Sequence, residues 1–178
     1  MSEDRPRAVR RVVTGHDAAG HSIISEDQAL NWRGGVLTEL WQSDRSPAAA
    51  HAYADTENTA PRLEPPPSGT VLRFFTLAPG LETLSRDSLE AEIAAAYDAM
   101  GGSHCRVDTR RHPGMHRTKT LDYIIVLEGT VTLLLDDGET DLHPFDVVIQ
   151  RHTNHAWLNR TDRPALLACV LIDADPAI

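Results

Sequence analysis

The chain has 178 residues, a length that fits one domain with a substantial core. Its 26 acidic and 17 basic side chains give a formal net charge of −9. This charge would repel phosphate backbones and anionic membrane surfaces, so we expect neither nucleic acid nor a membrane as a partner. Cys105 and Cys169 form no CxxC pair, which favours buried thiols in a reducing compartment. The N-terminus is charged and no apolar run approaches the ~20 residues of a membrane helix, so we expect a cytoplasmic protein.

The first third of the chain predicts few regular elements. Residues 8–14 and 21–25 are short β-branched runs on either side of GHDAAG, a pattern typical of a hairpin. Residues 35–42 have the composition of a strand, which we place on the outside of a sheet. From 43 to 68 the composition changes to Ala, Pro and small polar residues, with a possible helix start at Ser46-Pro47. Such a long irregular stretch indicates either a lid or a subunit arm.

The middle of the chain predicts one strand and one helix. Residues 70–77 alternate as a strand, in which we expect Arg73 to reach solvent, with an inward, anion-binding arginine as the alternative. Residues 87–100 have apolar side chains at helical spacing and end at Gly101-Gly102. We expect this helix to cover an outer face of the fold and Tyr97 to be a core residue.

The remaining chain predicts a succession of short strands. Residues 121–135 form two strands broken at Glu128-Gly129, and a tight turn at Asp137-Gly138 precedes a further strand. Residues 146–150, 155–159 and 165–172 supply the others. Short strands with regular turns are typical of an all-β sandwich or jelly-roll barrel.

Two of these segments have the polar residues of a site. Alternate residues of a strand share a face, so His116 and Thr118 point the same way, and Asp122 shares a face with Ile124 and Val126. In the second segment the residues at alternate positions are His155, Trp157 and Asn159. We therefore expect the two segments to converge on one pocket with a polar cluster against an apolar wall.

These residues resemble the two motifs of the cupin superfamily. His116 matches the first histidine, Asp122 stands where the family has glutamate, and six residues separate Asp122 from Gly129, as in the family. His155 and Asn159 match the second motif. Two departures are Thr118 in place of the second metal-binding histidine and the shorter carboxylate of Asp122. The phrases MHRTKTLDY, VLEG, TNHAWLN and RRVVTGHD resemble a small single-domain subgroup whose fungal members resemble polyketide-tailoring enzymes.

The resemblance implies an all-β cupin jelly-roll barrel with one covering helix. Residues 70–178 would form the barrel, and residues 1–69 would supply a hairpin, an outer strand and an irregular arm that pack on it, within one structural domain. It also implies a homodimer, formed through sheet edges or the N-terminal hairpin, because an exposed edge strand needs covering.

Three hypotheses follow for the chemistry. His116, Asp122 and His155, with His152 as a further candidate, could hold one divalent metal (Fe, Zn, Mn or Ni), and two histidines with one carboxylate suit an iron-dependent dioxygenase. Without a metal, the same three groups could catalyse acid–base lyase, dehydratase or cyclase chemistry on a small, carbonyl-bearing, polyketide-like substrate. Alternatively, the pocket only binds a small molecule. In each case the expected ligand-contacting residues are Thr118, Tyr123, Ile124, Val126 and Trp157.

Overall fold

The computed structural model describes residues 8–18, 21–33, 36–45, 48, 56 and 59–175. Along these residues the N-terminal elements are β1 (Val9–His16), β2 (Ser22–Leu30), β3 (Leu37–Ser43), β4 (Thr70–Leu77) and α1 (Arg86–Ala99). The C-terminal elements are β5 (Thr120–Glu128), β6 (Val131–Leu135), β7 (Glu139–Leu142), β8 (Val147–Arg151), β9 (His155–Leu158) and β10 (Ala165–Asp173). The predicted predominance of strands is confirmed.

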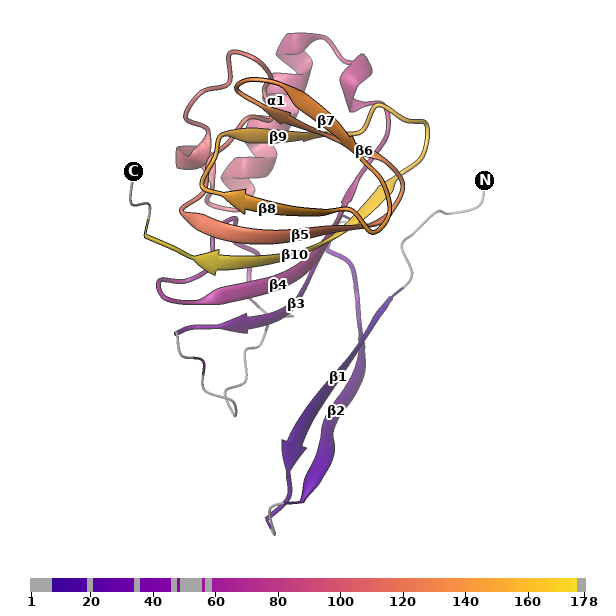
Figure 1. Cartoon of the computed structure of the whole chain (residues 1–178), viewed down its shortest axis with the longest axis vertical. Helices are drawn as coiled ribbons and strands as arrows, with labels where there is room; N and C mark the ends of the chain where they lie inside the picture. The colour runs from indigo at the N-terminus through magenta and orange to yellow at the C-terminus, as the bar shows by residue number, and fades with distance from the viewer. Residues whose placement is uncertain are drawn as a thin grey trace.

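Two antiparallel sheets form the body of the molecule (Figure 1). The larger sheet has the strand order β3-β4-β10-β5-β8 and the smaller has the order β7-β6-β9. Several strands that are neighbours in space are distant in sequence, as in a jelly roll. Strand β10, for example, pairs with both β4 and β5. A core cluster that includes Ile124, Val126, Leu133 and Leu167 joins residues of both sheets. The all-β jelly-roll prediction is therefore confirmed.

The predicted two-residue alternation is present in β5. Asp122, Ile124 and Val126 are buried, whereas Tyr123 and Ile125 lie on the outer face and are 40% and 36% exposed. Successive side chains of a strand point to opposite faces. The sheet thereby places Asp122 among apolar neighbours on its inner face.

The turn between β5 and β6 requires glycine. Gly129 has a φ of +78°, and a Cβ at this position would lie 2.8 Å from the Cα of Ala165. Asn159, which follows β9, fixes the next loop, because its side-chain amide donates to the carbonyls of Leu77 and Arg163. The sequence motifs thus include residues whose role is to shape loops around the site.

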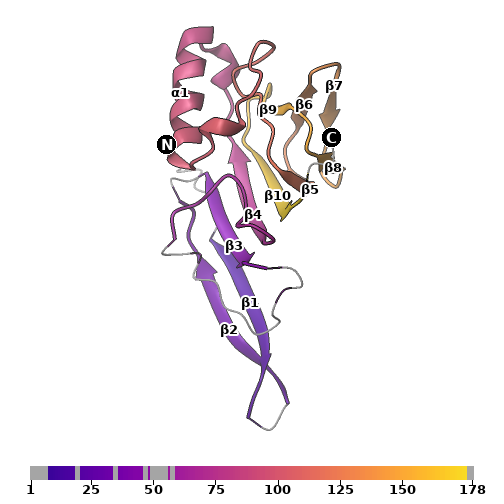
Figure 2. The ribbon, with the colours of Figure 1, turned by 90° about the vertical axis from the view of Figure 1, so that its left-hand side faces the viewer.

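The N-terminal hairpin forms as predicted and projects away from the two sheets (Figures 1 and 2). Near its base, the guanidinium of Arg11 donates to the Leu40 carbonyl and to Thr56. The predicted outer strand is β3, an edge strand that pairs with β4. Residues 46–47, 49–55 and 57–58, which include the possible helix start at Ser46-Pro47, lie outside the described residues. The lid and the subunit arm therefore both stay predictions.

Helix α1 has the predicted sequence position and is the one covering helix of the prediction. Its N-terminus is capped by the Ser85 side chain, which accepts from the Ser88 amide, and the chain leaves the helix at Gly101, with a φ of +63°. On the covered side of the helix, Ile93, Tyr97 and Met100 line a cavity. Within the described part of the chain, no helix is long and apolar enough to cross a membrane.

Candidate active site

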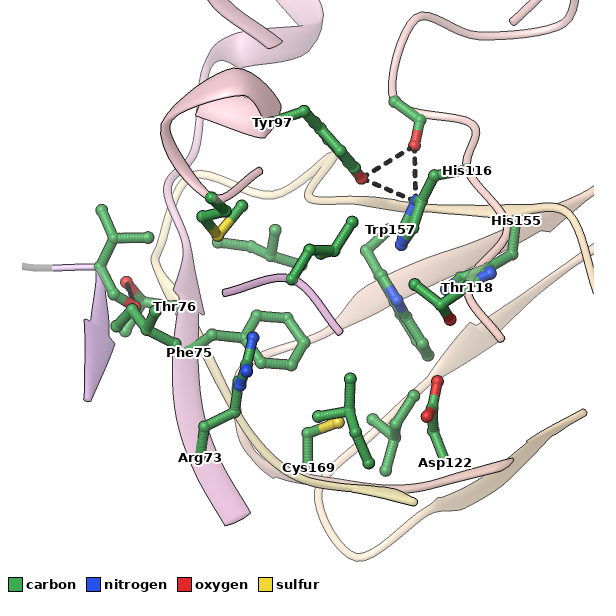
Figure 3. A pocket seen from close by; sticks show the side chains of 18 of the residues that line it. Arg73, Phe75, Thr76, Tyr97, His116, Thr118, Asp122, His155, Trp157 and Cys169 are labelled. Carbon is green, nitrogen blue, oxygen red and sulfur yellow. Dashed lines mark hydrogen bonds between the residues drawn. The ribbon is translucent and has the colours of Figure 1, made fainter. Parts of the chain in front are cut away.

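A cavity of about 270 Å³ lies between the sheets and α1 (Figure 3). Its walls are largely apolar and include Phe75, Leu77, Met100 and Leu171. The polar residues in the lining are few and include His116, Thr118, Asp122, His155 and Arg73. An apolar pocket with a small number of convergent polar groups is the usual form of a small-molecule site.

The two motif histidines meet in this cavity, as the sequence predicts. The backbone amides of His116 and His155 each donate to the other residue's carbonyl, at 2.9 and 3.0 Å. This isolated antiparallel bridge places the imidazole centroids 4.2 Å apart. The backbone therefore holds the two rings side by side.

The tautomer of His155 follows from its hydrogen bond. Its Nδ1 lies 2.9 Å from the Thr153 carbonyl oxygen, which can only accept, so Nδ1 carries the proton and Nε2 keeps a lone pair. Burial, and then the neighbouring His116, lower the pKa of His155 to about 3. His155 is therefore neutral near pH 7 and offers one basic nitrogen.

Tyr97 completes the surroundings of His116. Its hydroxyl lies 2.7 Å from His116 Nδ1 and donates to the Gly114 carbonyl at 3.4 Å, while Nδ1 lies 3.0 Å from the same carbonyl (Figure 3). All three contacts are satisfied when Nδ1–H donates, which leaves the lone pair on Nε2. Burial lowers the pKa of His116 to about 4.

Tyr97 lies inside the fold, as expected of a core residue, and its contact with His116 goes beyond that expectation. Burial raises the pKa of its hydroxyl, so this group stays protonated. Its helical spacing indicated an inward position, but nothing in the spacing showed that a histidine lies opposite.

Asp122 is a buried carboxyl group on the floor of the cavity. Desolvation raises its pKa to about 6, opposed by a hydrogen bond from Thr120 and by the charge of Arg73. Its Oδ1 is buried and has no hydrogen-bond partner. The Thr120 hydroxyl lies 2.6 Å from that of Thr118. Asp122 therefore changes its protonation state close to neutral pH.

The other predicted site residues divide into two groups. Thr118, Ile124 and Trp157 line the cavity, and the Trp157 ring packs edge-on against His155, with 5.8 Å between centroids. The prediction that Tyr123 contacts the ligand is wrong. Its neighbours Asp122 and Ile124 face the cavity, so the side chain of Tyr123 points to the outer face of the sheet.

Val126 and His152 are also outside the cavity lining. Val126 is 1% exposed within the core between the sheets, so packing already covers it. His152 follows β8 with a φ of +50°, and its Nδ1 donates to the Thr118 carbonyl. Its ring is thereby held in a loop contact rather than beside His116 and His155.

Arg73 lies inside the fold, contrary to the expectation that its tip reaches solvent. It is 5% exposed, lines the cavity and forms an ion pair with Glu39 at 2.9 Å. The alternative, an inward arginine, is the one that the structure supports. Residues 70–77 are apolar on both faces, so their alternation did not reveal which face is buried.

The cavity residues do not fit a three-ligand metal centre as they lie. Ligand atoms that share one ion at bond lengths of about 2.0–2.3 Å must lie within roughly twice that distance of one another. Among the described residues, only Glu64, His104 and Cys105 place three donor atoms within 4.8 Å of one another. His116, Asp122 and His155 do not meet this condition, so as they lie they do not hold one ion between them.

The Glu64, His104 and Cys105 group lies outside the cavity lining. His104 Nε2 is 2.9 Å from Glu64 Oε2 and 3.5 Å from Cys105 Sγ. Burial and the adjacent Glu64 raise the pKa of the Cys105 thiol to about 12. Both cysteines are free and buried, as predicted. These three residues could hold a cation, separately from the site described above.

Comparison with known proteins identifies the family. Residues 103–171, which include both histidine motifs, match the family described as "Cupin domain". "Cupin-domain-containing oxidoreductase fogC" of Aspergillus ruber is 28% identical over 180 residues, covering 94% of this chain and 73% of the relative. "Phomopsin biosynthesis cluster protein C'" of Diaporthe leptostromiformis is 29% identical over 168 residues, covering 87% and 72%.

A solved structure also matches at low similarity. It is a "Cupin 2 conserved barrel domain protein" from Salinispora arenicola, 16% identical, with 79% of this chain and 76% of that chain covered and a TM-score of 0.39. The matched family, the related biosynthetic proteins and the jelly-roll arrangement of the strands agree with one another. Residues 103–171 of the chain form a cupin domain.

Proposed function

We propose that this cupin is an enzyme of small-molecule biosynthesis that transfers protons at a carbonyl-bearing, polyketide-like substrate, in a lyase, dehydratase or cyclase reaction. The observation that supports it is the enclosure of three titratable groups, each with a displaced pKa, in one apolar cavity. Perturbed titratable groups in a cavity are typical of catalytic sites.

The three groups suit different steps of such a reaction. Asp122, with a pKa of about 6, exchanges its proton readily near neutral pH, as a general acid or base must. The Nε2 lone pairs of His116 and His155 can accept hydrogen bonds from substrate hydroxyl groups. Removal of a proton beside a carbonyl and protonation of a departing hydroxyl would eliminate water. Attack of the same enolate on a second carbonyl of the substrate, with protonation of its oxygen, would close a ring. The apolar walls would exclude competing water.

A second candidate function is that of an oxidoreductase. It is favoured by the name of the Aspergillus ruber relative, a cupin-domain-containing oxidoreductase whose match covers 94% of this chain. It would require a cofactor held at the cavity or elsewhere. Simple binding without turnover is the third possibility that an experiment must separate from the other two.

Hydrogen–deuterium exchange tests the proposed proton transfer without knowledge of the natural substrate. A panel of small aryl ketones and β-diketones in D₂O is incubated with the protein, and exchange at the carbon beside the carbonyl is followed by NMR. We expect exchange without added metal, lost in Asp122→Asn and His155→Ala. A matched control is Asp162→Asn, an exposed aspartate, which should retain exchange.

The same samples separate the alternatives. Oxygen consumption that appears only with added Fe(II), without exchange in its absence, would favour the oxidoreductase and contradict the proposal. Binding of panel members by the wild-type protein with neither exchange nor oxygen consumption would favour a binding module. The metal content of untagged protein, purified without chelator, shows whether exchange occurred in metal-free protein.

A further inference from the structure

Arg73 is the one cation whose side chain lines the described cavity. It lies on the inner face of β4, opposite Cys169 of β10, and Cys169 lies opposite Ile124 of β5. Figure 3 shows its guanidinium directed into the cavity, beside Phe75. Arg73 precedes residues 103–171, the part of the chain that matches the cupin family, so that match assigns it no role.

The hydrogen bonds of Arg73 leave part of its guanidinium unused. An arginine has five N–H donors. Nη2 donates to Glu39 Oε1 at 2.9 Å and to the Arg62 carbonyl at 2.6 Å. Nε has no partner, and the described residues show no hydrogen bond from Nη1. Burying a charged group costs free energy when some of its N–H donors have no hydrogen-bond acceptor.

A purely structural ion pair does not explain this geometry. The planar guanidinium can bind a carboxylate through two parallel N–H···O bonds, yet Glu39 meets only Nη2. Glu39 is itself buried, and desolvation raises its pKa. The pair therefore lies where both charges are poorly solvated. Nε is itself buried without a partner, so Nη1 is the part of the guanidinium left for a second acceptor.

We propose that Arg73 anchors a carboxylate of the ligand, so that the natural substrate is a small, mostly apolar carboxylic acid rather than a neutral ketone. The two N–H groups of Nη1 can donate to a carboxylate. Its apolar body would lie along the walls of the cavity toward Trp157 and the two histidines. This inference rests on the proposed function, because it takes the cavity as the substrate site.

A pair of ligands that differ only in charge tests the assignment. trans-Cinnamate and its neutral amide, cinnamamide, have nearly the same shape, and isothermal titration calorimetry gives the dissociation constant of each. We expect wild-type protein to bind cinnamate about tenfold more tightly than cinnamamide or better, as charge-assisted hydrogen bonds imply. The double variant Arg73→Met/Glu39→Gln removes both charges together and should bind the two ligands equally.

Two further variants serve as controls for the position and the charge of Arg73. Arg160 forms an exposed ion pair with Glu139 outside the cavity, so Arg160→Met should keep the preference for cinnamate. Arg73→Lys keeps the positive charge and should keep part of the preference for cinnamate. Circular dichroism and thermal unfolding establish that each variant is folded.

The possible failures differ from one another. Equal binding of both ligands by wild-type protein, or a preference that persists in the double variant, would overturn the role of Arg73 while leaving the cavity as a binding site. Binding of neither ligand at millimolar concentration would overturn this inference, and the exchange assay would still decide the proposed function on its own.

Discussion

Replacing Asp122 with asparagine should stabilise the protein while it removes activity. The buried carboxyl has a pKa of about 6 instead of 3.8. At 1.36 kcal/mol per pKa unit, ionised Asp122 is about 3 kcal/mol less favourable in the folded protein than in the unfolded chain. Asparagine has nearly the same shape and cannot ionise, so the variant avoids this cost.

The effect should depend on pH in a defined direction. Because folding raises the pKa of Asp122, its favourable contribution is complete below about pH 4 and is lost as the pH rises through about 6. The free energy of unfolding of Asp122→Asn, relative to wild type, should therefore increase from pH 4 to 6 and then level off about 3 kcal/mol higher. For a chain of this length, that difference corresponds to roughly 6–12 °C in the melting temperature.

Urea unfolding at half-unit pH intervals from 4 to 8 measures this difference. Contributions from the two histidines cancel when the variant is subtracted from wild type, since both proteins contain them. Asp162→Asn serves as the exposed control and should show no such pH dependence. A variant that is less stable than wild type at pH 7.5, or a difference that does not change with pH, would refute the reasoning.

Three further predictions concern other parts of the molecule. Folding lowers the pKa of His155 from 6.5 to about 3, so its stabilising contribution is lost as the pH falls below 6.5. His155→Gln should therefore make the acid loss of stability shallower in urea unfolding, and an unchanged slope would contradict this. Gly129→Ala should lower the free energy of unfolding by more than about 1–2 kcal/mol, because the new side chain meets a left-handed backbone conformation and a backbone clash. Gly138→Ala, with a similar φ but open space around it, should lower it less. Equal losses in the two variants would contradict the clash. The outer side chains of β5 and β8 are apolar and exposed, so we expect a second copy of the chain to cover them. Light scattering should show a dimer that Val147→Lys weakens. A monomeric wild-type protein would contradict this prediction.

Much of the site could be predicted because its determinants are local in sequence. Alternation along a strand puts Asp122 and Ile124 on one face. Gly129 marks its turn because its backbone conformation suits glycine. Each of these features depends on a few neighbouring residues and on backbone geometry that is the same in every protein.

The tertiary structure decided which faces are inside and what each group meets there. Strand β4 has apolar residues on both faces, so only its pairing with β10 shows that Arg73 faces the cavity. Only the packing of α1 over that cavity brings Tyr97 to His116. The displaced pKa values of Asp122 and the two histidines arise from desolvation, which depends on the whole surrounding fold. Residue types and spacing therefore determined which groups are available for chemistry, and burial by distant segments determined their protonation states.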